Sequence, residues 1–477
     1  MKILKTTALA IGVLILMMVL VAAGALIIDK KGTAYLEVRG NPAFESNTYL
    51  ITNVNIVPMT ADTVLLNQMV LIQDGVIARI ADAITDSKAK VFDAGGGYLT
   101  PGLVDMHVHV WDEYELGLYL ANGVTTVRNL WGQPMHLRMK KAISNEEVIG
   151  PVFFTSGPKL TGPEYMGDDN LQLFTAEEAY SKVAEYKERG YDFIKTYYGL
   201  TGELFDAVVE KGRELDFDIV AHPSPKVPYS YHFKPEIVTI EHAEEIVQQP
   251  LEYRLDTARL SEVVDLYASH PHTALCPTLV VYYNIYRLLT EDDILNSEGL
   301  AYMNPIIRAV DSQAQFDRWA GTKSNDSTIV SRIKDQHDFH LLAIKKLHER
   351  QVKIVAGTDA GIGVTPPGYS LHEELNFYTQ AGMSNYQALQ TATINPSKTH
   401  DFLSNQGSIE IGKLANLILT KDNPLDRLEV LRNPQMVMVR GRMINQEILD
   451  EFKEKARNRS NLLASALRYA ENLITEK

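Results

Sequence analysis

The stretch Pro101-Gly102-Leu103-Val104-Asp105-Met106-His107-Val108-His109 begins the central part of this chain. Its apolar run predicts a buried strand, and side chains at positions i and i+2 of a strand point to the same side. His107 and His109 therefore face the same way at the strand end. Two neutral imidazoles in that arrangement suit a divalent metal ion such as zinc. A surface strand with alternating histidines and no metal is the alternative that this stretch alone leaves open.

Seven further apolar runs follow, and helical patterns such as residues 176–189 separate several of them. This alternation is typical of repeated βαβ units with a parallel sheet. Eight such units close into a barrel more naturally than into an open sheet, so we predict an α/β fold with a (β/α)8 TIM-like barrel. The eight predicted strands are 103–109, 124–128, 152–156, 193–197, 218–222, 237–241, 274–281 and 353–359.

Short β-rich runs with turn signals lie on both sides of this central part. They predict one small composite β-sandwich domain, formed by residues 45–98 and 405–447. The barrel then occupies residues 99–404, with a polar helical insertion near 284–338 that could cover its mouth. Residues 448–477 predict a charged C-terminal helix that packs on the body through apolar positions: Leu449, Phe452, Leu462, Leu463 and Leu467.

The N-terminal segment, residues 1–31, predicts a membrane anchor or a signal segment. Lys2 and Lys5 precede a nearly unbroken apolar run over residues 8–28, and Asp29-Lys30-Lys31 follows it. About twenty apolar residues can cross a bilayer. A signal peptide cleaved near Ala23-Gly24-Ala25 is the alternative. We favour an uncleaved anchor because the apolar run continues past that point. Both interpretations place the rest of the chain outside the cytoplasm, in the periplasm or the extracellular space.

The composition restricts the partners. The chain has 477 residues and a formal net charge of −14, and its Lys and Arg do not cluster. Because phosphate binding needs clustered cations, we expect no nucleic-acid partner. The single cysteine, Cys276, lies in an apolar run and is expected to be an inert core thiol. A small-molecule substrate is expected, and the sequence leaves assembly into a homo-oligomer open.

Residues that bind metals stand where several predicted strands end. Besides His107 and His109, the fifth strand ends at His222, the sixth is followed by His242, and the eighth ends at Asp359. In a barrel of this kind, the side chains that do chemistry stand at the C-terminal strand ends. Each residue alone could be a buried histidine or a helix cap. Their equivalent positions together predict one metal site.

Lys195 lies inside the fourth predicted strand, between apolar and aromatic neighbours. A buried unpaired ammonium is costly, so either this side chain reaches solvent at the strand end or it has another role. We predict that its amine takes up carbon dioxide and that the carbamate bridges two metal ions. His107, His109 and Asp359 would then bind the more buried ion, and His222 and His242 the other.

These motifs resemble the amidohydrolase superfamily, in particular metal-dependent hydrolases similar to imidazolonepropionase and to Xaa-Pro or Xaa-Arg dipeptidases. The resemblance runs from about residue 50 to residue 445. It rests on the opening stretch, on Gly123–Asn129 and Phe193–Lys195, on His222 and His242, and on Gly357–Gly361 and Gly407–Leu417. The resemblance implies the barrel with a composite β-sandwich. It also implies ligand roles for His107, His109, Lys195, His222, His242 and Asp359. Asn129 and Asn416 stand where many relatives carry aspartate; neither is a ligand.

The predicted reaction is hydrolysis of an amide or peptide-like C–N bond in a small substrate: a dipeptide, an N-acyl amino acid or a cyclic amide. Two divalent ions, for which zinc is the expected metal, would lower the pKa of a shared water to give a hydroxide and would polarise the carbonyl. Asp359 would accept the proton and deliver it to the departing amine. Tyr197, Tyr198, Arg128 and His372 are the candidate substrate contacts.

Three other functions remain open. A mononuclear deaminase of the same superfamily commonly carries His-x-x-Glu after strand five, whereas Pro223-Ser224-Pro225 follows His222 here. A lactonase or phosphotriesterase-like esterase could use the same pair of metal ions. A non-catalytic, membrane-tethered binding protein is the alternative from another class.

Overall fold

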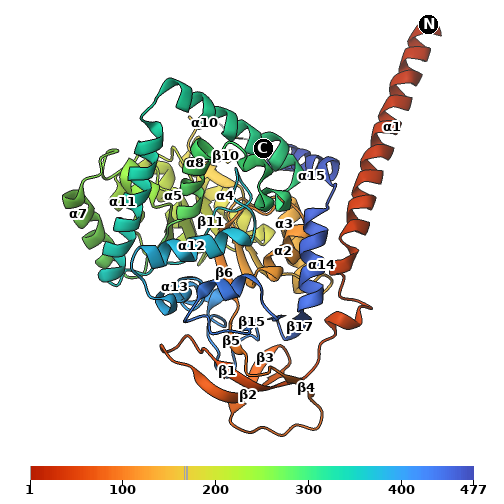
Figure 1. Cartoon of the computed structure of the whole chain (residues 1–477). Helices are drawn as coiled ribbons and strands as arrows, with labels where there is room; N and C mark the ends of the chain where they lie inside the picture. The colour runs from red at the N-terminus through yellow and green to blue at the C-terminus, as the bar shows by residue number, and fades with distance from the viewer. Residues whose placement is uncertain (1, 166, 168–169, 477) are drawn as a thin grey trace.

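The structure is a computed structural model that describes residues 2–165, 167 and 170–476. Figure 1 shows a body of strands surrounded by helices, a β-sheet domain at its lower end, and one long N-terminal helix that projects from its side. The chain is α/β, with a body of parallel strands and an extra domain, as expected; the strands of the body do not form one continuously paired, closed barrel.

The extra domain is built from both ends of the chain. Its eight strands form one hydrogen-bonded sheet in the order β17-β16-β15-β5-β1-β2-β3, with β4 paired to β1. The N-terminal strands β1–β5 and the C-terminal strands β15–β17 meet where β15 pairs antiparallel with β5. The two segments of the expected sandwich are therefore joined in one continuous sheet. The strands are β1 (Tyr49–Ile56), β2 (Leu65–Gln73), β3 (Val76–Ala81), β4 (Lys90–Asp93), β5 (Tyr98–Pro101), β15 (Leu417–Thr420), β16 (Met436–Val439) and β17 (Arg442–Asn445).

The strands of the body are all parallel and fall into two ladders. One has the order β6-β7-β8 and the other β10-β9-β11-β12-β13-β14. At one side, a single bridge from Ser156 to Phe193 joins the two ladders. At the other side, the segment 354–360 lies between them, because Ile354 bridges to Leu275 and Ala360 bridges to Val108. The strands are β6 (Leu103–Val108), β7 (Val124–Asn129), β8 (Val152–Thr155), β9 (Lys159–Thr161), β10 (Asn170–Gln172), β11 (Ile194–Thr196), β12 (Ile219–Ala221), β13 (Ile237–Glu241) and β14 (Ala274–Cys276).

Two of the eight predicted strands differ from the structure. The seventh is shorter, because the chain turns at Thr278 with φ of 50° and begins helix α8 (Leu279–Thr290). The buried Glu374 carboxylate accepts the N–H groups of Leu279 and Val280 and so stabilises that helix start. The eighth predicted strand makes only the single bridges given above.

Helices cover the body, and local sequence sets their ends. For α4, the Thr175 side chain accepts the Glu178 N–H, Glu178 accepts the Thr175 N–H, and Gly190 ends the helix with φ of 91°. Besides α8, the helices are α1 (Lys2–Gly32), α2 (Tyr114–Ala121), α3 (Pro134–Ser144), α4 (Ala176–Arg189), α5 (Gly202–Glu214), α6 (Glu244–Gln248), α7 (Thr257–Ala268), α9 (Pro305–Ile307), α10 (Gln313–Asn325), α11 (Ile329–Glu349), α12 (Tyr369–Gln380), α13 (Asn385–Thr391), α14 (Gln446–Arg457) and α15 (Leu462–Thr475).

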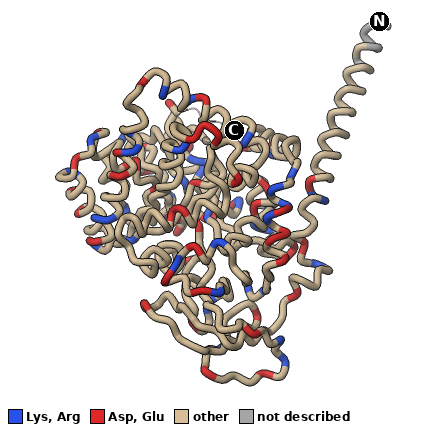
Figure 2. Tube along the Cα trace, in the orientation of Figure 1, with Lys and Arg blue, Asp and Glu red and all other residues tan. Residues whose placement is uncertain are grey.

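Helix α1 differs from the others in composition and position. Within its segment Leu9–Gly32, the most apolar stretch of 18 residues has a mean hydropathy of 3.0 and is not buried, whereas Asp29 near the end of the segment is buried. In the described part of the chain, α1 is the one helix with the length and composition to cross a membrane. A signal sequence would pass the same test. Figure 2 shows acidic and basic residues scattered over the body, while the upper described length of α1 carries none.

The C-terminal region forms two helices where one was expected. Helix α14 buries Leu449 and Phe452, in line with packing on the body. Helix α15 instead leaves Leu462 and Leu463 exposed. The chain turns between the two helices at residues 458–461, where the buried Arg459 pairs with Asp112.

Candidate metal centre

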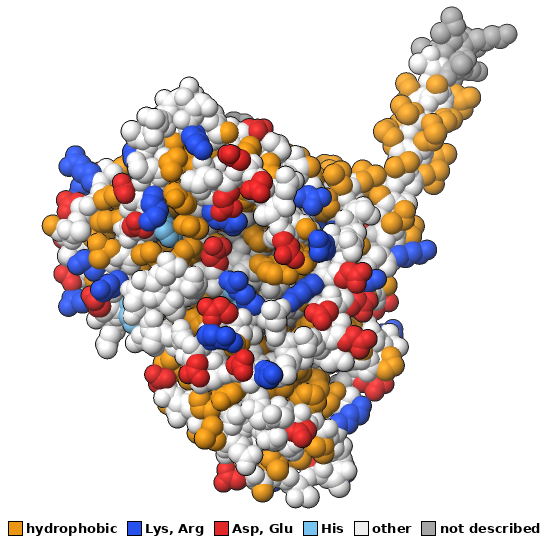
Figure 3. Space-filling model, viewed as in Figure 1, with side chains coloured by type: hydrophobic (Ala, Val, Ile, Leu, Met, Phe, Trp, Pro, Cys, Tyr) orange, Lys and Arg blue, Asp and Glu red, His pale blue; other side chains and the backbone are white. Residues whose placement is uncertain are grey.

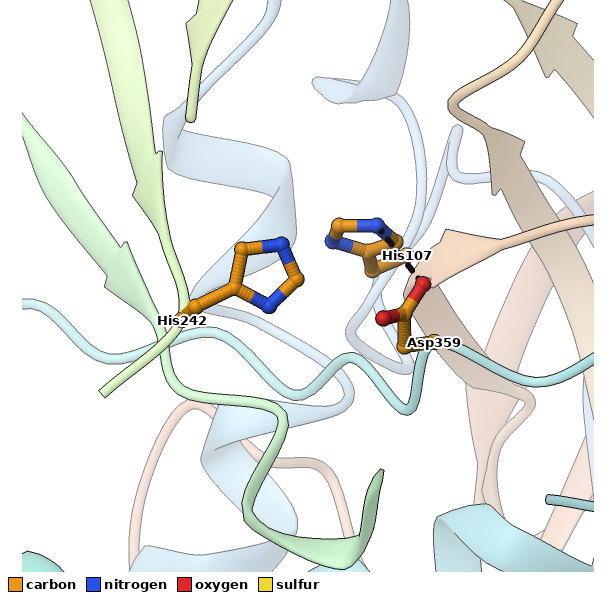
Figure 4. Close-up of side chains that lie close together, drawn as sticks. All are labelled: His107, His242 and Asp359. Atoms are coloured by element: carbon orange, nitrogen blue, oxygen red, sulfur yellow. Dashed lines mark ion pairs between the residues drawn. The ribbon is translucent and has the colours of Figure 1, made fainter. Parts of the chain in front are cut away.

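The ends of several strands bring the predicted ligands close together. His107 lies in β6 with His109 just beyond its end, and His222 and His242 directly follow β12 and β13. Asp359 comes from the segment that bridges β6 and β14. Figure 4 shows His107, His242 and Asp359 facing one another. One ligand atom from each of these three lies within 4.8 Å of the other two.

The contacts extend this group to the other histidines. Asp359 Oδ1 lies 2.7 Å from His109 Nε2 and 3.1 Å from His107 Nε2. The His242 ring lies 4.8 Å from the His107 ring and 4.7 Å from the His222 ring, centroid to centroid. Burial lowers the pKa of His109, His222 and His242, which favours the neutral imidazoles that metals bind.

Lys195 is 1% exposed, and its Nζ has no hydrogen-bond partner among the described residues. Burial lowers the pKa of this amine to about 8. The ring nitrogens of His222 likewise lack a hydrogen bond there, although Glu245 Oε1 is 3.3 Å from Nε2. Buried polar atoms of native proteins are nearly always satisfied. The unsatisfied nitrogens of Lys195 and His222 are therefore what we expect of residues that bind a metal ion or another bound group.

The backbone is strained at two of the candidate ligands. His242 has φ of 70° and Asp359 has φ of 58°, the left-handed region that non-glycine residues seldom adopt. Such strain clusters at functional sites, where the surrounding structure holds it in place. Here the Asp359 N–H donates to the His107 carbonyl and the His242 N–H to the Cys276 carbonyl, both at 2.8 Å. The two conformations are thus fixed by neighbouring barrel segments.

Groups behind the cluster orient its imidazoles. Glu241 Oε2 lies 2.7 Å from His107 Nδ1, and Thr278 Oγ1 lies 2.8 Å from His242 Nδ1. In each case the other ring nitrogen is left to face the cluster, as is usual for metal-binding histidines. Although burial by itself would raise the pKa of Glu241, Arg128 and His107 hold it well below its usual range.

His107, Glu241 and Cys276 also form a tight group of metal-binding residue types. In this group Glu241 already pairs with Arg128 at 2.9 Å and with His107 Nδ1. Burial raises the pKa of the Cys276 thiol well above its usual range, which disfavours the thiolate. We therefore interpret Glu241 and Cys276 as residues that hold His107 in place, and the group of His107, His242 and Asp359 as the candidate metal site.

The predicted substrate contacts divide into two pairs. Tyr197 and Tyr198 remain at the site, because their rings lie 4.5 and 4.8 Å from the His222 ring. Tyr198 also borders a cavity of about 500 Å³, whose wall includes Val227, Tyr229 and Gln249.

Arg128 and His372 lie away from that cavity. Arg128 is fully buried and its guanidinium is used by Glu241, Thr239, His400 and the Met106 carbonyl, because a buried cation needs partners on all sides. His372, on α12 outside the barrel, donates its Nε2–H to the Asn122 carbonyl at 3.0 Å. Neither is placed to contact a substrate at the cluster.

Several residues at the site were not predicted. Lys159 in β9 stands over the Tyr197 ring at 4.5 Å, and Glu245 in α6 accepts the Tyr198 hydroxyl at 3.2 Å. Tyr165 stacks on Tyr198. The sequence places Glu245 three residues after His242, which could have identified it. Lys159, at the start of the unpredicted strand β9, and Tyr165, in the loop that follows it, carry no such signal.

Asn129 and Asn416, which stand where many relatives carry aspartate, both have structural contacts. Asn129 Oδ1 accepts the Val110 N–H at 3.0 Å, directly after His109. Asn416 Oδ1 accepts the Arg440 N–H at 2.8 Å in the sheet domain. An amide oxygen supplies the same acceptor as a carboxylate in these places.

Comparisons with known proteins agree with this geometry. The model of the Amidohydrolase family matches residues 303–444. A dihydroorotase from Carboxydothermus hydrogenoformans is 44% identical over 179 residues, which cover 36% of this chain and 41% of the relative. A dihydroorotase from Bacillus thuringiensis is 52% identical over 40 residues, 8% of this chain and 9% of the relative. The chain thus matches less than half the length of these curated relatives.

Solved structures match over most of the chain. A bottromycin amidohydrolase is similar with a TM-score of 0.71 and 23% identity, covering 90% of this chain and 95% of the other. A Xaa-Pro dipeptidase with bound methionine has a TM-score of 0.63 and 21% identity, covering 83% and 100%. At these identities the likeness concerns the fold. The Amidohydrolase family model covers less than half of this chain, so it shows a similarity to that family over residues 303–444, the part that contains Asp359.

Proposed function

We propose that this protein is a metal-dependent hydrolase that cleaves an amide or peptide-like C–N bond of a small substrate. The observation that carries the proposal is the convergence of buried residues at the strand ends, with Lys195 Nζ and the His222 nitrogens lacking hydrogen bonds within the described residues. A barrel kept only as a binding scaffold would have no need for strained, unsatisfied polar groups at one point.

The residues present fit two divalent ions, with zinc the metal that this set of nitrogen and oxygen donors suits. His107, His109 and Asp359 would hold one ion and His222 and His242 the other, and a carbamate on Lys195 would supply an anion that offsets their charge. The carbamate forms when the neutral Lys195 amine adds to carbon dioxide and loses a proton. When bound, such ions lower the pKa of water and polarise a carbonyl group.

The chain's own groups then handle the protons. Asp359 is 7% exposed and reaches the centre of the cluster from its strained backbone. Its carboxylate accepts a proton from the attacking water and returns that proton to the departing amine. Glu241 keeps His107 oriented from behind. Tyr197 and Tyr198, on the His222 side, border the space where the substrate binds.

The substrate classes that fit are dipeptides, N-acyl amino acids and cyclic amides, because loops rather than the cluster select the acyl and amine groups. The partial likeness to dihydroorotases makes dihydroorotate one compound to test. A lactonase or phosphotriesterase-like activity is the second candidate, since the same residues could act on esters. A mononuclear deaminase would leave the buried Lys195 without a role.

The experiment is a hydrolysis screen on full-length protein loaded with zinc or manganese in the presence of bicarbonate. The panel contains dipeptides, N-acyl amino acids, dihydroorotate, lactones and phosphotriesters. Turnover of a C–N substrate that is lost on chelation and regained with metal supports the proposal. Turnover of esters alone would move the assignment to the second candidate. Absence of bound metal by elemental analysis would favour a non-catalytic binding protein.

We also propose that α1 is an uncleaved anchor that holds the catalytic domain outside the cytoplasm. The most apolar stretch of α1 is not buried, and Lys30 and Lys31 lie in the last turn of the helix. A signal peptide is the alternative. Mass determination of the mature N-terminus distinguishes the two, because cleavage near Ala25 would remove most of α1.

A further inference from the structure

Helix α15 has its apolar face outward. Its buried residues are small or polar, namely Ala464, Ser465 and Asn472. Its exposed residues are large and apolar: Leu462 at 48%, Leu463 at 44%, Leu473 at 38% and Ile474 at 79% exposure. With 3.6 residues per turn these four, together with Ala466, Leu467 and Ala470, form one continuous stripe without a charge. A helix on the surface of a soluble body normally has the reverse arrangement.

Specific contacts hold α15 in this orientation. Arg138 donates to Glu471 at 2.6 and 2.8 Å, and Glu476 pairs with Arg189. Ser465 Oγ accepts from Asn304 at 2.9 Å. The Tyr469 ring lies 5.8 Å from the Trp111 ring, which follows β6 at the end of the barrel that carries the metal centre. The outward stripe is therefore a fixed feature of the fold.

The stripe adjoins the apolar surface of α1. Arg468 of α15 pairs with Asp29 of α1, and a cavity between the helices is lined by Ala25, Ile28, Leu463 and Ala464. Ile27 and Ile28 of α1 are 57% and 70% exposed. Figure 3 shows hydrophobic side chains over the upper right of the body, close to the base of the projecting helix. The two helices thus present neighbouring apolar surfaces.

We infer that the outward stripe of α15 lies in the surface of a lipid bilayer, as a second membrane contact beside α1. An amphipathic helix buries its apolar face at the boundary of headgroups and acyl chains, and large exposed apolar patches mark such contacts. The polar side of α15, which would face water in a free helix, is instead bound to the protein. The charged groups of the helix lie off the stripe and are paired. This inference rests on the proposed membrane anchor.

The test uses full-length protein in vesicles of phosphatidylcholine and phosphatidylglycerol. The described Cys276 is buried, so a cysteine at an exposed position takes an environment-sensitive fluorophore selectively. The variants are Leu463→Cys and Leu473→Cys on the stripe, with Ser87→Cys in the exposed β3–β4 loop as the matched control. We expect blue-shifted emission and quenching by spin-labelled lipids at both stripe positions, and neither at Ser87→Cys.

In one outcome the protein floats with the vesicles while the fluorophores on the stripe show the same emission as Ser87→Cys and no quenching. That result would overturn the inference but not the proposed anchor. Blue shift without lipid quenching, together with cross-linking between copies at Leu463→Cys, would assign the stripe to a second copy and also overturn it. Protein that does not float with the vesicles would overturn the anchor and this inference with it. None of these outcomes touches the proposed hydrolysis, which is assayed separately.

Discussion

Two clusters of buried ionisable groups lie back to back inside the barrel and differ in how their polar atoms are satisfied. The front cluster consists of the candidate metal ligands His107, His109, Lys195, His222, His242 and Asp359. In it, Lys195 Nζ and His222 have no hydrogen bond among the described residues. In the rear cluster, Arg128 binds Glu241, Thr239 and His400, and His400 pairs with Asp218 at 2.6 Å. The difference indicates that the front cluster is built to bind a further group and that the rear cluster is complete in the protein alone.

The largest effect is expected at the carboxylate of the front cluster. In Asp359→Asn the side chain keeps its shape but no longer accepts a proton, so kcat should fall on the order of 10³-fold. Metal content, measured by elemental analysis, should stay close to that of the native protein, because an amide oxygen can still bind. Turnover within a few-fold of native would contradict the proton-transfer role.

The second test concerns Lys195. Removing its amine in Lys195→Ala takes away the carbamate, so activity should fall by at least the roughly 10- to 100-fold seen when groups supporting a metal site are lost. Added formate, acetate or propionate should restore part of the activity by replacing the missing anion. Lys195→Arg, whose side chain forms no carbamate and fills the space, is the matched control and should show no rescue. Full activity of Lys195→Ala without any added acid would contradict the bridging role.

The third test breaks the rear cluster. Arg128→Met leaves Glu241 buried without its cation, so the free energy of unfolding should fall by about 3–5 kcal/mol in denaturant melts. Activity should fall as well, since Glu241 orients His107. The matched control is Arg138→Met, whose partner Glu471 is on the surface, and there the loss should be about 1 kcal/mol or less. Equal losses in the two variants would show that the rear cluster carries no special stability.

The sequence predicted the front cluster better than the rear one for a physical reason. His107, His222, His242 and Asp359 stand at the ends of apolar runs, and a barrel gathers strand ends at one place. Arg128 also follows a strand run, so it was expected at a substrate. Whether a charged residue at that point turns outward or is buried depends on partners such as Glu241 and His400, which come from distant segments.

The fold shows the same division between local and distant determinants. Periodicity located most of the parallel strands because strands alternate with helices along the chain, but the three-residue strands β9 and β10 were not predicted. It failed after Cys276, where the apolar residues of α8 continue the pattern of a strand and the helix start depends on the distant Glu374. It also gave no sign that the apolar residues of α15 point outward. Both features depend on tertiary contacts that no local pattern encodes.

The smallest expected effect tests a buried group outside both clusters. His340 in α11 is fully buried, packs on the Tyr282 ring at 4.6 Å, and has no charged partner among the described residues, so burial lowers its pKa to about 3. Because the unfolded chain binds this proton more readily, the contribution of His340 to stability is complete above pH 6.5 and is lost progressively as the pH falls towards 3. At pH 5 the loss is about 2 kcal/mol, since each unit of pKa difference is worth about 1.4 kcal/mol.

Denaturant melts at pH 7.5 and pH 5 would measure this. His340→Gln cannot be protonated, so its loss of stability between the two pH values should be smaller than that of the native chain by about that amount. His270→Gln, at a part-buried site where the Nδ1 binds the Leu266 carbonyl, is the matched control and should follow the native chain. If His340→Gln and the native chain lost the same stability, the proton would reach His340 in the folded state. The α11 region would then open to water at mild acidity.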